Sequence, residues 1–247
     1  MLTGPFLDRN WMAENKDYNK SDIVMLGMPF DGTVSYRPGS RFAPEQIRLA
    51  SWGLEEYSPY FDKHLEDCNF HDAGDLEFPL GNTEKSLEVI EKNVEEIYKD
   101  GKKVFGIGGE HLVTLPEIKA VSKFYDNLAI VHFDAHTDLR EEYLGEALSH
   151  SAVIRHSADI VGFENLKQIG IRSGMKEEFE FLMDEYNVDL VCNMEYARKN
   201  NMYSLGLVQS DLVNTYIVPC DIWCEKNPFH ECELYSWYMV KHVETLN

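Results

Sequence analysis

A run of apolar residues that ends in alternating aspartate and histidine most tightly constrains what this chain can fold into. The segment 128–133 is apolar enough to be a buried strand, and Asp134, His136 and Asp138 follow it directly. Side chains two residues apart in an extended segment point to the same side, so these three groups can converge on one cavity. Carboxylate and imidazole together suit a divalent ion such as manganese better than an ion that prefers thiolates. The segment therefore predicts a metal site.

Apolar runs alternate with helical patterns over much of the chain. The predicted strands are 22–28, 103–107, 128–133 and 166–171, and the predicted helices are 43–54, 83–100, 116–125, 149–157 and 177–186. Helix 83–100 is the clearest, because Leu87, Ile90, Val94 and Ile97 form one apolar stripe at the helical period. This alternation predicts an α/β fold with three layers, α/β/α, and a mainly parallel central sheet.

Length and charge narrow the class of protein further. The chain has 247 residues and no marked boundary, so we expect a single domain over 1–247, with a divergent C-terminal part at 176–247 where the pattern loosens. With 23 basic and 43 acidic residues, the net charge of −20 argues against nucleic-acid binding and favours a cationic substrate or a metal ion.

The lack of a recognisable secretory signal in residues 1–20 and the cysteine content both favour a cytoplasmic location. The first residues, 1–20, lack the apolar core of a secretory signal, and no window approaches the roughly 18 apolar residues of a membrane span. The five cysteines are an odd number and do not form a disulfide framework. We therefore expect a cytoplasmic protein with no membrane partner.

A second motif follows the predicted strand 103–107. It reads Gly108-Gly109-Glu110-His111, and its two glycines allow the backbone to turn sharply, which leaves His111 free to reach the cavity of Asp134. A single histidine after a glycine pair is more often structural than a ligand. Both motifs, however, lie past the carboxyl ends of predicted strands, where open α/β sheets bind their ligands.

Taken together and in this order, the two motifs resemble those of the ureohydrolase family of arginases and agmatinases. The resemblance implies that His111 and Asp138 hold one manganese ion, that His136 holds a second, and that Asp134 bridges both. The segment 35–44, SYRPGSRFAP, with Ile47-Arg48 after it, resembles the agmatinase signature rather than the arginase one. Its arginines and tyrosines fit loop packing or subunit contact better than catalysis.

His150 falls where the family carries a histidine that moves protons near the substrate. An imidazole suits this role because its unperturbed pKa is about 6.5, although a capping or core role stays open. The implied reaction is hydrolysis of the guanidinium group of agmatine, a small cationic guanidino substrate, to urea and putrescine. Guanidinium is planar and resonance-stabilised, and water at neutral pH hardly attacks it. The resemblance also implies a homo-oligomer.

One part of the family pattern is missing from this sequence. The family has a late Ser-x-Asp-x-Asp-x-x-Asp-Pro string whose aspartates complete both metal shells, and no such string occurs here. Asp211, Asp221 and Glu225 do not align with it and receive no role. Two alternatives therefore stay open, namely a catalytically impaired metal-binding or regulatory subunit, and an amidinohydrolase that acts on another guanidino compound.

The C-terminal part also holds a cluster of possible zinc ligands, Cys220, Cys224, His230 and Cys232. Their spacing departs from the usual CxxC pairs of zinc sites. Incidental thiols are therefore the favoured interpretation.

Overall fold

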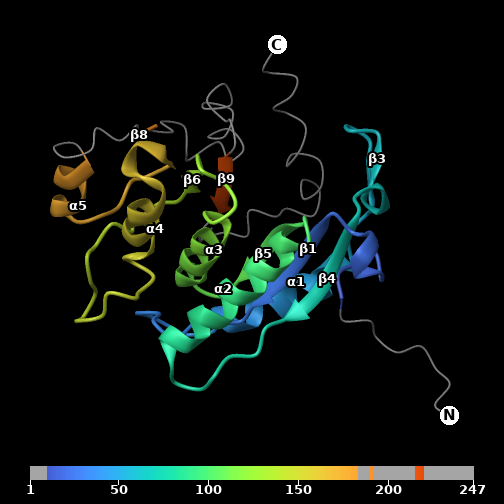
Figure 1. The fold of residues 1–247 in the computed structure, drawn as a ribbon, viewed down its shortest axis with the longest axis horizontal. Coiled ribbons are helices and arrows are strands. Elements are labelled where there is room, and N and C mark those ends of the chain that lie inside the picture. Colours follow the sequence, from blue (N-terminus) through green and yellow to red (C-terminus); the bar gives the residue numbers. More distant parts are fainter. Residues whose placement is uncertain (1–9, 183–189, 192–214, 220–247) are drawn as a thin grey trace.

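The structure is a computed structural model that describes residues 10–182, 190–191 and 215–219 (Figure 1). Its strands are β1 (Ile23–Met28), β2 (Tyr57–Ser58), β3 (Lys63–His64), β4 (Phe70–Asp75), β5 (Lys103–Gly108), β6 (Ala129–Phe133), β7 (Leu166–Ile169), β8 (Leu190–Val191) and β9 (Thr215–Pro219). Its α-helices are α1 (Ala43–Ser51), α2 (Thr83–Lys99), α3 (Thr114–Val121), α4 (Val153–Val161) and α5 (Lys176–Phe181).

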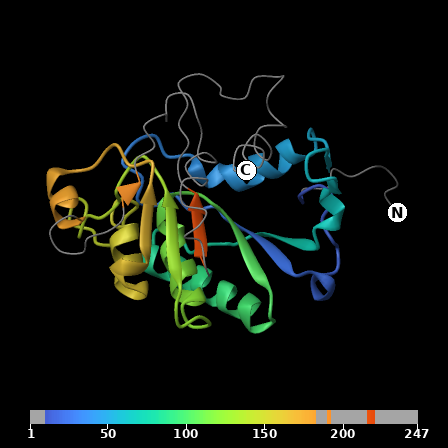
Figure 2. The same cartoon turned by 90° about the horizontal axis from the view of Figure 1, so that it is seen from above.

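The larger strands pair in parallel throughout. One sheet has the order β4-β1-β5 and the other the order β8-β7-β6-β9, while β2 and β3 form a separate antiparallel hairpin. Figure 2 shows α1 on one face of the strands and α2, α3 and α4 on the other. Parallel strands need cover on both faces, which explains the apolar sequences of β1 and β6. The predicted three-layer α/β/α fold is confirmed.

Helix α2 contributes much of the core between the sheet and α3. Ile90 and Val94 are fully buried, as the apolar stripe predicts. Asn82 caps the first turn by accepting a hydrogen bond from the backbone N–H of Lys85 at 2.9 Å. Gly101 follows the helix with a φ of +76°. Glycine adopts this backbone conformation readily, whereas residues with a side chain rarely do.

Several element boundaries differ from those that the sequence predicts. Helix α1 ends at Ser51 rather than at 54, and α3 begins at Thr114, two residues before the predicted proline. The helix predicted over 149–157 is wrong in position, since α4 begins at Val153. The backbone carbonyl of Asp138 accepts hydrogen bonds from the first turn of α4, at 3.1 and 3.2 Å, and so fixes where this helix starts.

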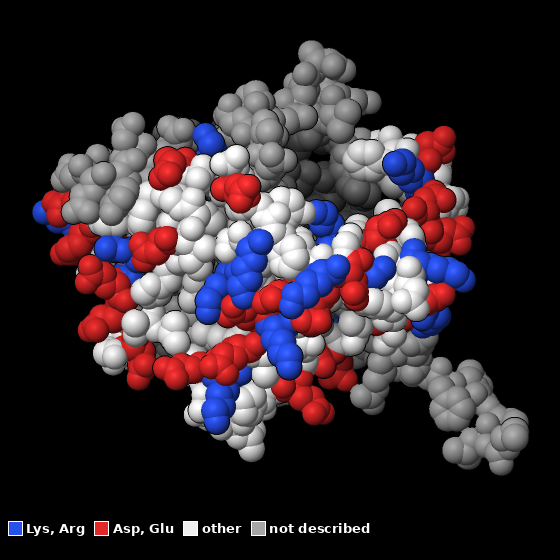
Figure 3. Space-filling view, in the orientation of Figure 1, with Lys and Arg blue, Asp and Glu red and all other residues white. Residues whose placement is uncertain are grey.

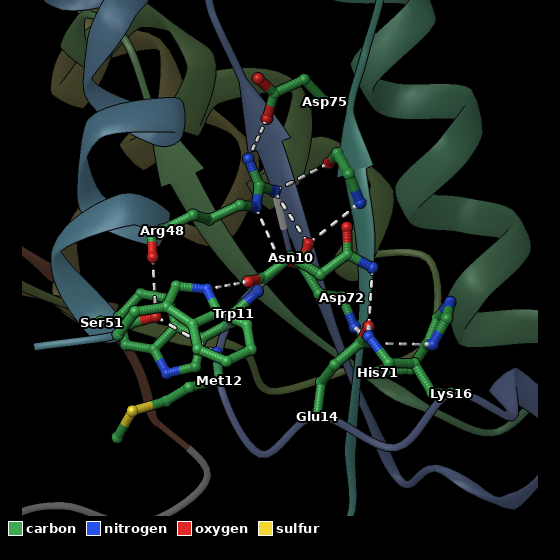
Figure 4. A network of polar contacts seen from close by, with 12 residues as sticks. Asn10, Trp11, Met12, Glu14, Lys16, Arg48, Ser51, His71, Asp72 and Asp75 are labelled. Atoms are coloured by element: carbon green, nitrogen blue, oxygen red, sulfur yellow. Dashed lines mark hydrogen bonds and ion pairs between the residues drawn. The ribbon is translucent and has the colours of Figure 1, made fainter. Parts of the chain in front are cut away.

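Strand β4 was not predicted, because its sequence, FHDAGD, is polar. A buried ion pair compensates for this polarity (Figure 4). Arg48 of α1 donates hydrogen bonds to both oxygens of Asp72, at 2.7 and 2.9 Å, and it also pairs with Asp75. Burial alone would lower the pKa of Arg48, but the two carboxylates outweigh it and raise the pKa. Arg48 thus packs α1 onto the edge of the sheet and lies away from the cavity described below.

The same network fastens the N-terminal segment. The backbone N–H of Trp11 donates to Asp72 at 2.8 Å, and Glu14 accepts from the backbone N–H of Asp72 at 2.8 Å. The backbone N–H of Met12 donates to Ser51 at 3.1 Å. These contacts give the otherwise exposed edge strand β4 a cover.

The remaining expectations concern membrane spans and the C-terminal part. Among the described residues, no helix combines the length and the apolar character that crossing a membrane requires. Helix α5 begins at Lys176, as predicted within a residue, and is described as far as Phe181. The possible zinc ligands, together with Asp211, Asp221 and Glu225, lie outside the described residues.

Candidate metal centre

Histidine and aspartate side chains gather at the carboxyl ends of β5 and β6. His111 opens a short 3-10 helix (His111–Val113) after β5, and its Nδ1 lies 2.7 Å from Oδ2 of Asp138 and 3.8 Å from Oδ2 of Asp134. With His132, these residues place four ligand atoms within 4.8 Å of one another. The structure therefore brings together three of the four predicted ligands and adds one residue that was not predicted.

This set of donors fits a divalent metal ion. Imidazole nitrogens and carboxylate oxygens bind such ions. Among the residues that the structure describes, no cysteine belongs to the cluster. Asp134 is buried and Asp138 lies nearby, and two carboxylates at such a site gain from a shared cation.

Gly109, in the glycine pair before His111, is required by a close approach of two loops. Gly109 donates its backbone N–H to Met28 at 2.9 Å, and Glu110 donates to Phe30 at 2.7 Å. A Cβ atom on Gly109 would overlap the backbone of Phe30. The loop after β1 therefore runs directly against the loop that carries His111.

Asp138 is held in an unusual backbone conformation. Its φ of +51° lies in the left-handed region, which aspartate tolerates better than most residues. Glu178 of α5 fixes the loop by accepting hydrogen bonds from Thr137 Oγ1 at 2.7 Å and from the backbone N–H of Leu139 at 2.9 Å. Glu178 could not be predicted from the sequence, because an acidic residue in a polar helix normally faces solvent.

His136 lies beside the cluster rather than within it. Its side chain is 53% exposed, and its Nδ1 lies 3.2 Å from Oδ1 of Asp134. That oxygen also accepts the backbone N–H of His136 at 2.7 Å. The role of His136 as a metal ligand stays a prediction.

His132 is the residue of the cluster that sequence reasoning missed. It is fully buried, stacks on the ring of His111 with centroids 5.0 Å apart, and places Nε2 3.0 Å from Oδ2 of Asp134. Burial lowers its pKa, although Asp134 acts in the opposite direction. Gln168 donates to its Nδ1 at 2.9 Å, so the neutral ring carries its proton on Nε2 and donates it to Asp134. His132 stands two residues before Asp134, in the same every-second-residue pattern as Asp134 and His136, and this spacing could have predicted it.

His150 faces the same cavity as the metal cluster. The cavity has a volume of about 530 Å³, and its lining includes His111, Asp138, His136 and His150. His150 lies in the turn before α4, where its ring meets that of Tyr143 edge to face at 5.7 Å. The predicted proton carrier and three of the four predicted ligands thus line one cavity.

The fold and the site together define the class of this protein. It is a parallel α/β protein with a candidate metal-binding site at the carboxyl ends of its strands. Within that class, a sequence model described as the arginase family matches residues 21–213. The chain belongs to the arginase family, which confirms the resemblance to ureohydrolases.

Individual relatives agree with this assignment. The chain is 56% identical over 171 residues to the agmatinase of Bacillus subtilis (strain 168), covering 69% of this chain and 59% of the relative. It is 54% identical over 174 residues to the agmatinase of Halalkalibacterium halodurans, covering 70% and 60%. The crystal structure of agmatine ureohydrolase of Thermoplasma volcanium superposes with a TM-score of 0.76 at 30% identity, over 87% of this chain and 71% of that chain. The chain thus spans about three fifths of the length of these two curated relatives.

Proposed function

We propose that this chain is a manganese-dependent amidinohydrolase of the agmatinase type, which converts agmatine to urea and putrescine. The observation that carries the proposal is the cluster of His111, Asp134 and Asp138, in which His111 and Asp138 line the same cavity as His150. The similarity to curated agmatinases supports agmatine as the substrate.

In this proposal, His111, Asp134, His136 and Asp138 hold the metal. When bound, manganese supplies a nucleophilic water at neutral pH and stabilises the charge that develops at the attacked carbon. His132 orients the Asp134 carboxylate by donating a hydrogen bond to it, and Gln168 in turn holds His132 by donating to its Nδ1. Such supporting contacts are typically worth about ten- to a hundred-fold in metal affinity or activity.

The other residues of the cavity suit a cationic substrate. Its lining includes three acidic residues, Glu110, Asp138 and Glu178, and two basic ones, Arg37 and Arg140. The acidic side chains attract a guanidinium group. Burial raises the pKa of Glu110, while hydrogen bonds from Thr33 oppose this shift. His150 would give a proton to the departing amine. The face shown in Figure 3 carries acidic side chains with basic ones among them, in keeping with the net charge of −20.

We further propose that the chain acts in the cytoplasm as a homo-oligomer and that it forms a single domain over residues 1–247, with a divergent part at 176–247. Gel filtration with light scattering would test the oligomer, and a mass equal to that of one chain would contradict it.

The experiment that tests the function is urea release from agmatine by the purified protein with manganese. Arginine and guanidinobutyrate serve as competing substrates, and metal content is measured on the same sample. We expect urea from agmatine at a higher kcat/KM than from the others. Bound metal without urea from any of them would instead identify a metal-binding subunit, the alternative raised by the missing late aspartates. A higher kcat/KM for another guanidino compound would overturn agmatine as the substrate.

A further inference from the structure

Thr33, in the loop after β1, contacts both sides of the cavity through all of its polar groups. Its hydroxyl donates a hydrogen bond to Oε1 of Glu110 at 2.6 Å and accepts one from the backbone N–H of His150 at 3.1 Å. Its backbone N–H points to the same Glu110 carboxylate, at 3.1 and 3.2 Å. Its carbonyl oxygen lies 2.9 Å from Nδ1 of His150.

The last of these contacts determines which nitrogen of His150 carries the proton. A backbone carbonyl oxygen can only accept a hydrogen bond, so Nδ1 of His150 must donate. In the neutral imidazole, the lone pair then lies on Nε2, on the far side of the ring from Thr33. Nε2 is therefore the nitrogen that can take a proton from the cavity or give one to it.

The hydroxyl of Thr33 holds this arrangement in place. It is a bridge between the backbone of His150 and the buried carboxylate of Glu110, which directly precedes His111. Glu110 is itself anchored by its backbone hydrogen bond to Phe30 at 2.7 Å. Thr33 thus links the turn that carries His150 to the loop that carries His111, a candidate metal ligand. Thr33 and His150 are 117 residues apart in the sequence.

We propose that Thr33 is a positioning residue that holds His150 in the tautomer with its proton on Nδ1 and with Nε2 turned to the substrate. The inference rests on the proposed function for its effect on catalysis, but the tautomer itself does not depend on that function. In the other tautomer Nε2 already carries the proton, so Nε2 could not take up the proton that it later gives to the departing amine, and proton transfer would slow.

The test is the protonation state of His150, observed by long-range ¹H–¹⁵N correlation of the imidazole nitrogens at alkaline pH. Full-length protein labelled with ¹⁵N is used in the presence of diamagnetic Zn²⁺, and His150→Gln identifies the signals among those of nine histidines. We expect the wild type to carry its proton on Nδ1 alone. Thr33→Val, which keeps the shape and removes the hydroxyl, should give a mixture of tautomers, and Thr33→Ser should restore the wild-type pattern.

Activity provides the second readout. In Thr33→Val we expect kcat for agmatine to fall by about ten- to a hundred-fold with KM little changed, and Thr33→Ser should recover it. Thr83→Val is the matched control, because Thr83 does not line the cavity. Thermal midpoints show whether each variant is folded, and Thr33→Ala, which also removes the hydroxyl, takes the place of Thr33→Val if Thr33→Val does not fold.

The two failures can be told apart. A proton on Nε2 in the wild type, or an unchanged His150 pattern in folded Thr33→Val, overturns the role of Thr33. Absence of urea release by the wild type contradicts the proposed function instead, while the tautomer pattern still decides the role of Thr33.

Discussion

Asp134 connects more of the candidate metal centre than any other described residue. One carboxylate oxygen lies near His111 and His132, at 3.8 and 3.0 Å, and the other lies near His136, at 3.2 Å. His150, in contrast, faces the cavity without belonging to the cluster. Substitution of Asp134 should therefore affect metal binding, and substitution of His150 should affect proton transfer alone.

We expect Asp134→Ala to abolish metal uptake and His150→Ala to leave it intact. Loss of a carboxylate that contacts three histidines removes more than a supporting contact, so manganese affinity should fall by more than about a hundred-fold. Elemental analysis after gel filtration and titration calorimetry measure this. Equal metal loss in both variants would refute the two roles.

Asp31, in the loop after β1, makes the stability of the fold depend on pH. Its buried carboxylate accepts hydrogen bonds from Nε of Arg41 and, at 2.8 Å, from the backbone N–H of Gly39. The hydrogen bond from Arg41 lowers the pKa of Asp31, although burial opposes it. Because the folded pKa lies below the unfolded value of about 3.9, the ionised group stabilises the fold above that value, and this contribution is lost as the pH falls toward the folded pKa.

Asp31→Asn should accordingly lower the free energy of unfolding by about 1.5 kcal/mol at neutral pH, at the low end for a charged hydrogen bond because Arg41 is half exposed. The difference from wild type should persist at about pH 5 and narrow only below about pH 4. Urea unfolding at several pH values measures it. A difference that stays constant to the lowest pH would show that the charge of Asp31 is not the cause.

At the scale of elements, the cap of α2 is a local contribution that can be measured alone. Asn82→Ala removes the side-chain oxygen that accepts from Lys85, and we expect a loss of about 1 kcal/mol in the free energy of unfolding. Asn82→Asp keeps an acceptor there and should cost much less. Denaturant unfolding with an unchanged m-value checks this. An equal loss in both variants would mean that the cap hydrogen bond contributes little.

The central strands and α2 could be predicted because their signals are local. The apolar runs of β1, β5, β6 and β7 and the stripe of α2 depend only on neighbouring residues. Strand β4 could not be predicted, since its polar residues are compensated by Arg48, which lies far away in the sequence. The start of α4 was misplaced for the same reason, because a carbonyl outside the helix, that of Asp138, fixes it.

The same division applies to the candidate site. His111, Asp134 and Asp138 stand in recognisable strings, and the structure brings them together. Glu178 and Thr33 support the site through hydrogen bonds to residues distant in the chain, and no short pattern marks them. Such supporting residues come into view only when the loops are placed against one another.

At the scale of the whole molecule, the parallel arrangement explains why the site is where it is. Loops that follow β1, β5 and β6 carry Thr33, His111 and Asp134, and residues of all three loops meet around one cavity. The strands provide a rigid support, and the loops provide the chemistry. A ligand that joins several of these loops should therefore stabilise the fold as a unit.

Metal binding should accordingly raise the thermal midpoint of unfolding. A ligand that binds only the folded state, at about a hundred times its Kd, contributes about 2.7 kcal/mol. For a chain of this size, about 1 kcal/mol shifts the midpoint by about 2–4 °C, so manganese should raise it by about 5–10 °C and a chelator should reverse the shift. Asp134→Ala should lose the shift, whereas His156→Gln should keep it, because His156 contacts Ala147 at the base of α4 and does not line the cavity. A full shift in Asp134→Ala would place the stabilising ion elsewhere in the molecule.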